Sequence, residues 1–143
     1  MFAKIVQNSV ESFPYTMRDL RRDNPNTSFP ATLPDEELEN FNVFRVTVTP
    51  TPENDPKTHR LEHSCELVDG VWTQVWTKHQ RELSSAEKNI REYRNDLLAK
   101  SDWTQLTDSS VSAVWTDYRQ ELRDVPQQEG FPYEVAWPEK PVS

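Results

Sequence analysis

The residues best suited to chemistry lie in one short stretch, "HRLEHSC" at residues 59–65. His59 and His63 are four residues apart, with Glu62 between them and Cys65 just after. On a helix this spacing places both imidazoles on one face, as in zinc enzymes. This stretch instead follows a proline-rich loop, leads into a predicted strand, and lacks the H-E-x-x-H order. We therefore expect loop histidines in solvent and no metal, with a small metal-dependent hydrolase as the least favoured alternative.

Other catalytic chemistry finds little support in the composition. Cys65 is the only cysteine and has no flanking cations, so nothing marks its thiol as activated. Only two glycines occur, too few for loops in which the backbone approaches a phosphate closely. The acidic cluster around Asp35 lies in a polar, proline-bounded segment, which indicates solvated charge. We predict no catalytic residues, no cofactor and a protein that is not an enzyme.

Charge and aromatic content point to a protein partner. The formal net charge of −8 repels phosphate backbones, which argues against nucleic acid, and no stretch is apolar enough to span a membrane. Five Trp, six Phe and four Tyr argue for a folded chain built on aromatic anchors, in which a partner or homo-oligomerisation adds stability. Arg18, Arg21 and Arg22 form a basic patch, which either docks an acidic partner or pairs with neighbouring aspartates.

The first half of the chain has the pattern of a small antiparallel sheet. Gln7, Asn8 and Ser9 mark a hairpin turn in residues 1–16, and Asp69-Gly70 marks a second hairpin. Thr16 begins a short helix, and another helical turn lies between residues 34 and 41. Alternating polarity predicts a strand over residues 41–50.

The second half changes to helical periodicity. In residues 83–103 the apolar residues Ile90, Tyr93, Leu97 and Leu98 form one helical stripe, and Ser84 and Glu87 form a capping-box pattern. A second apolar stripe follows a turn, with Asp108, Ser109 or Ser110 as its cap; it comprises Val111, Val114, Trp115, Tyr118, Leu122 and Val125. We predict an α+β protein: an antiparallel β lobe at residues 1–80, then an αα-hairpin and an extended C-terminal strand at residues 81–143.

Two groups of aromatic residues have competing interpretations. Trp72 and Trp76 share one face of a predicted strand, where they either face the helices as core or form a glycan-binding platform. We favour the core. Tyr133, Val135 and Trp137 lie in a proline-bounded strand that cannot bury both faces alone. We expect this segment to add to the edge of the sheet, or of another subunit, as an attachment device.

The second half resembles the phage tail assembly chaperone-like domain. Proteins with that domain carry R-x-x-L-L-x-x-S-D-W-T-Q-L, Y-R-Q-x-L-R-D and a G-F-P…W-P ending. The corresponding residues here are Arg94, Leu97, Leu98, residues 101–106, Tyr118 to Gln120, Leu122 to Asp124, Gly130 to Pro132, Trp137 and Pro138. The stretches "YTMRDLRRDNPNTSFP" and "LVDGVWTQVW" also resemble what precedes this domain in phage tail proteins.

The resemblance implies a non-catalytic protein that binds a phage tail-fibre or baseplate protein. It acts either as a structural component of the virion tail or as a fibre-assembly partner in the host cytoplasm. We expect Asp102 to satisfy backbone donors in the turn, Trp103 to fill the gap between the helices, and Arg119 with Arg123 to clamp the turn or a partner carboxylate. The predicted partner-binding residues are Tyr118, Arg119, Arg123, Phe131, Tyr133, Val135, Trp137, Arg18 and Arg21.

Overall fold

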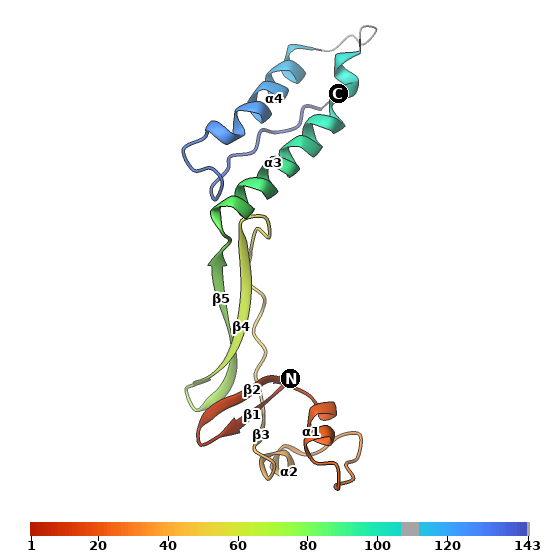
Figure 1. Cartoon of the computed structure of the whole chain (residues 1–143), viewed down its shortest axis with the longest axis vertical. Helices are drawn as coiled ribbons and strands as arrows, with labels where there is room; N and C mark the ends of the chain where they lie inside the picture. Colours follow the sequence, from red (N-terminus) through yellow and green to blue (C-terminus); the bar gives the residue numbers. More distant parts are fainter. Residues whose placement is uncertain (107–111, 143) are drawn as a thin grey trace. The chain divides into compact units, whose positions relative to one another are not determined.

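The computed structural model describes residues 1–106 and 112–142 and confirms the α+β class (Figure 1). The chain forms two compact units. Unit 1 comprises Met1–Glu53 and Leu61–Thr77, and unit 2 comprises Asn54–Arg60 and Lys78–Ser143. No helix in the described ranges has the length and apolarity needed to cross a membrane.

Unit 1 contains a three-stranded antiparallel sheet of order β2-β1-β3. Strands β1 (Phe2–Val6) and β2 (Ser9–Tyr15) form the predicted hairpin. Gln7 and Asn8 both have positive φ angles, 51° and 61°, as the tight hairpin turn requires. The local turn signal was therefore sufficient to place this hairpin.

Two short helices cover part of the core of unit 1. Helix α1 (Met17–Asp23) begins at Thr16, which with Asp19 forms a reciprocal capping box, and α2 (Asp35–Glu39) is the second predicted turn. Leu20 and Leu38, one from each helix, are buried with Tyr15 and Val43 in one apolar cluster. Apolar burial thus holds these short helices, which would be marginal in isolation.

The strand predicted over residues 41–50 is shorter than expected. Strand β3 covers only Val43–Arg45, where it pairs with β1. The chain then changes partner, because the Thr47 N–H donates to the Trp72 carbonyl and the Thr47 carbonyl accepts from the Gln74 N–H, both at 2.9 Å. Polarity alternates over residues 41–50, but residues 43–45 pair with β1 and Thr47 pairs with residues 72 and 74.

The long hairpin of β4 (His59–Val68) and β5 (Val71–Gln80) turns at Asp69-Gly70 as predicted, with φ angles of 49° and 80°. Trp72 packs on Phe44, and Trp76 stacks on His63 with ring centroids 5.1 Å apart. The expectation that these rings face the helices is wrong, because residues of unit 1 itself cover them.

Unit 2 holds the predicted αα-hairpin. It consists of α3 (Leu83–Lys100), the 3₁₀ turn η1 (Asp102–Gln105), α4 (Ala113–Asp124) and the short turn η2 (Val125–Gln127). The capping box predicted at Ser84 is wrong, since the helix already begins at Leu83 and its N-cap, Glu82, makes no side-chain cap bond. The predicted caps Asp108, Ser109 and Ser110, and Val111, lie outside the described residues.

The C-terminal segment, residues 128–142, runs along the helical hairpin between α3 and α4 (Figure 1). It is extended from residue 135 onward but is not a β-strand, so the predicted edge strand on a sheet is wrong. Instead, the side chain of Gln128 holds the backbone of Ala136: its Nε2 donates to the Ala136 carbonyl at 2.9 Å, and its Oε1 accepts from the Ala136 N–H at 2.8 Å. Prolines in the segment lack the N–H groups that a strand ladder needs.

Candidate functional site

Arg119 holds the turn between the two helices. Its Nη1 donates to the Leu98 carbonyl at 2.8 Å and to Ser101 Oγ at 2.6 Å, and its Nη2 donates to Asp102 Oδ1 at 3.0 Å. The side chain is buried, on the same face of α4 as Trp115 and Leu122. Arg119 therefore clamps the turn as expected, but exposed Arg123 makes no bond to it among the described residues, and Trp103, predicted to fill the gap, is 47% exposed.

The aromatic residues of the C-terminal segment contact the helices and the residues preceding them. Trp137 packs edge-on against Tyr93 at 4.9 Å and joins the buried cluster of Trp115, Tyr118 and Leu122. Phe131 lies under the Arg91 guanidinium, and the Tyr133 hydroxyl donates to the Arg81 carbonyl at 2.7 Å. These aromatic residues therefore contact other residues of unit 2.

Three predicted binding residues are exposed arginines. Arg123 lies in the last turn of α4. In unit 1, Arg21 donates to the Pro30 carbonyl at 2.9 Å, while Arg22 pairs with Asp19 and Asp23. Arg18 makes no hydrogen bond or ion pair with the residues described in that unit. The basic patch is therefore partly neutralised, with Arg18 as its free member.

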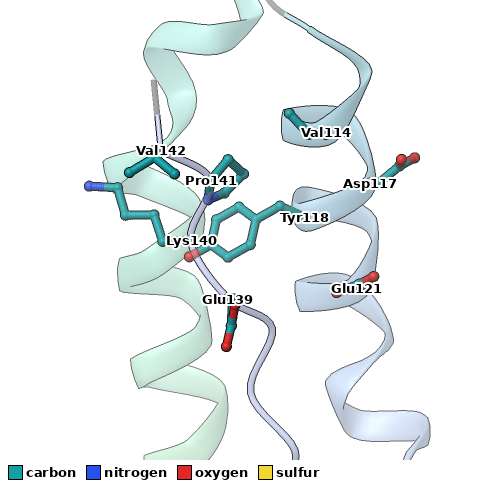
Figure 2. A pocket seen from close by; sticks show the side chains of 8 residues that line it. All are labelled: Val114, Asp117, Tyr118, Glu121, Glu139, Lys140, Pro141 and Val142. Atoms are coloured by element: carbon teal, nitrogen blue, oxygen red, sulfur yellow. The ribbon is translucent and has the colours of Figure 1, made fainter.

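A groove of about 430 Å³ lies between α4 and the end of the C-terminal segment (Figure 2). We call it the α4 groove; it is lined by Val114, Asp117, Tyr118, Glu121, Glu139, Lys140, Pro141 and Val142. Figure 2 shows the Tyr118 ring pointing from α4 toward Pro141, with Glu121 and Glu139 on opposite sides of the space. Burial is the main cause of a raised pKa at Tyr118, so this phenol is neutral at physiological pH.

The α4 groove combines apolar walls with an acidic border. Val114 is 54% and Val142 is 99% exposed, although both side chains are apolar. Asp117 and Glu121 are one helical turn apart on α4, and Glu139 adds a third carboxylate. Lys140 is the single cation among the lining residues. A second groove of about 310 Å³ shares Glu121 and has Trp137 and Pro138 in its wall.

The three histidines are divided between two strands, with His59 and His63 on β4 and His79 on β5. His63 Nδ1 lies 2.9 Å from Gln74 Nε2, and His59 Nδ1 lies 2.8 Å from the Thr58 hydroxyl. Four residues of a strand span roughly 13 Å, which is too far for two ligands of one ion. Over residues 1–106 and 112–142, no three His, Cys, Asp or Glu side chains are grouped as metal ligands.

Cys65 is a core residue of unit 1, packed with Ala3, Ile5 and Val46. Burial, with a smaller effect of Glu66, raises the pKa of its thiol. As expected from the sequence, nothing activates this thiol, because both packing and protonation oppose a thiolate nucleophile.

The sequence-based prediction missed most of the α4 groove. It named Tyr118 from the family pattern but not the carboxylates beside it or the residues 139–142. A usable signal existed, because Asp117, Glu121 and Asp124 recur at helical spacing along one side of the apolar stripe. No sequence pattern predicts that residues 139–142 line the same groove, because their contact with α4 joins residues far apart in the sequence.

Comparison with known proteins identifies the C-terminal part. Residues 87–142 match the family described as phage tail assembly chaperone protein. This range includes most of α3, all of α4 and the C-terminal segment. No curated protein and no solved structure gives a significant match. The match supports a phage tail assembly chaperone-like domain at residues 87–142 and suggests a phage tail-associated role for the chain.

Proposed function

We propose that this protein binds a tail-fibre or baseplate protein of a bacteriophage and promotes assembly of the tail. The observation that carries the proposal is the family match over residues 87–142. The same residues form the α4 groove and the C-terminal segment, so the proposed binding surface lies within the matched domain. The protein works by binding alone, as an assembly partner in the host cytoplasm or as a component of the virion tail.

The predicted binding residues take two different parts in this proposal. Arg119 and Trp137 shape the surface, because their side chains already bond or pack within unit 2. The other C-terminal residues, Phe131, Tyr133 and Val135, are half-buried and act in the same way. Tyr118 lines the groove, and Arg123 is exposed at its helix end for direct contact.

Unit 1 supplies a second contact in this proposal. Arg18 and Arg21 are exposed on α1, and Arg18 has no ionic partner in the described part of unit 1. An acidic surface on the tail protein complements this patch, and such exposed pairs contribute mainly to orientation and association rate. The affinity is expected to come from unit 2.

A co-purification experiment on infected cells tests the proposal. Affinity-tagged protein is purified from the cells, and its partners are quantified by mass spectrometry. Reciprocal purification starts from a tagged fibre protein, with tagged capsid protein as the control. Enrichment with a fibre or baseplate protein, and not with capsid, is expected. Equal recovery with the capsid protein, or no recovery of any tail protein, would refute the proposal.

Gradient-purified virions then separate the two forms of the role. A fixed ratio of this chain to the fibre protein in virions identifies a structural component of the tail. Absence from virions, together with recovery of the complex from infected cells, identifies an assembly partner that leaves before maturation.

Glycan binding, the main alternative from the sequence, is not favoured by the geometry. A sugar platform needs open ring faces, but Trp76 stacks on His63 at an interplanar angle of 22° and Trp72 packs on Phe44. Both rings are only partly exposed.

A further inference from the structure

We infer that the α4 groove receives a segment of the partner in which lysine or arginine residues flank apolar ones. This inference rests on the proposed function and specifies the chemistry of its binding site. Two features of the groove support it, namely the exposed apolar side chains and the sign of the charge, and the net charge of the whole chain is a third.

The apolar part of the groove is partly open to solvent. Val114 and Val142 are more than half exposed, and they flank a space whose wall is completed by Tyr118 and Pro141. Covering such side chains with an apolar partner residue removes their surface from water, which favours association. A purely ionic ligand would leave this surface uncovered.

The charged part determines the sign of the ligand. Asp117, Glu121 and Glu139 border the groove against one cation, Lys140. In the view of Figure 2, Lys140 extends away from α4 and Asp117 extends away from the C-terminal segment, whereas Glu121 and Glu139 adjoin the space. The potential at the groove is therefore negative, and cationic side chains of a ligand are attracted while anionic ones are repelled.

A second copy of this chain is a poor occupant. Each copy carries a net charge of −8, so two copies repel one another. The basic patch on α1 is the obvious complement, but Arg22 already pairs with Asp19 and Asp23 and Arg21 bonds to Pro30. A cationic, apolar segment from a different protein fits the groove better.

Fluorescence anisotropy with three labelled synthetic peptides tests the inference on the full-length protein. One peptide alternates lysine and arginine with leucine and valine, the second replaces the cations by glutamate, and the third replaces the apolar residues by serine. We expect the first to bind at least about tenfold more tightly than the other two. Failure of the first peptide to bind, or equal binding of the glutamate peptide, would overturn the inference.

Matched variants locate the binding. Glu121→Lys in the groove is expected to weaken binding of the basic peptide about tenfold. Glu129→Lys changes the net charge of the chain equally but lies outside both grooves, so its effect should be less than twofold. Val114→Ser should also weaken binding, compared with Val48→Ser, since Val48 is a similarly exposed valine in unit 1. Equal effects of each matched pair would contradict the assignment.

The intact tail protein distinguishes failure of this inference from failure of the proposed function. If the fibre or baseplate protein binds Glu121→Lys as tightly as the unchanged chain, the groove is not the site but the proposed function stands. If the peptides behave as expected but no tail protein binds, the proposed function fails. Concentration-dependent dimerisation that Glu121→Lys abolishes and that excludes the peptide would show a second copy in the groove and overturn the inference.

Discussion

The buried clamp of Arg119 allows a quantitative test of how the helical hairpin is held. Replacing Arg119 with alanine removes two bonds from a charged donor, to the Leu98 carbonyl and to Ser101 Oγ. Bonds of this kind contribute about 1.5–3 kcal/mol each. The third bond, to Asp102, adds little because that carboxylate is 67% exposed and screened by solvent.

One term opposes this loss. The Nε of Arg119 is buried and makes no hydrogen bond in the described part of the chain, and such a group costs about 1–3 kcal/mol. Truncation removes that penalty together with the favourable bonds. The net expectation for Arg119→Ala is a loss of about 2–4 kcal/mol in the free energy that opposes opening of the hairpin.

Hydrogen exchange followed by mass spectrometry measures the free energy of opening in peptides from α3 and α4. A loss of about 3 kcal/mol corresponds to exchange on the order of 100-fold faster. Arg123→Ala is the control, since that arginine is exposed one turn further along and contributes less than about 1 kcal/mol through the helix dipole. Arg119→Lys should fall between the two. If Arg119→Ala changes exchange no more than Arg123→Ala, the clamp does not stabilise the hairpin.

Three further predictions concern other parts of the chain. Gly130→Ala should loosen the C-terminal segment by about 1–3 kcal/mol, since the added Cβ would lie 2.8 Å from Glu134 Cβ; unchanged exchange in residues 128–137 would contradict this. The hydrogen bond that Asp23 accepts from the Tyr15 hydroxyl lowers the pKa of Asp23 below its ordinary value of 3.8. The stability that this bond contributes is therefore fully present above pH 3.8 and is lost as the pH falls through the folded-state pKa. The difference in urea midpoint between Tyr15→Phe and the unchanged chain should therefore shrink in acid, and a constant difference from pH 7 to pH 3 would refute it. Cys65 should react with a thiol reagent on the order of 100-fold more slowly in the folded chain than in urea, and equal rates would refute its burial.

Features that depend on neighbouring residues could be predicted from the sequence. The hairpin turns at Asn8 and Gly70 follow from backbone conformations that few residue types adopt. The capping box at Thr16 joins residues only three apart. The two helices follow from apolar spacing, and the family pattern is read directly from the order of residues.

Contacts between residues far apart in the sequence could not be predicted in this way. Thr47 alternates in polarity like its neighbours, yet its bonds go to β5 and not to the first sheet. Trp137 has the pattern of an edge strand, but the helices offer its ring a buried apolar contact that a proline-bounded strand lacks. The sequence left Arg119 to clamp either the turn or a partner carboxylate, and the packing of α3 against α4 places the Leu98 carbonyl and Ser101 Oγ within its reach. Which strands pair and which side chains are buried depends on contacts between residues far apart in the sequence. The periodicity of one segment gives no information about those contacts.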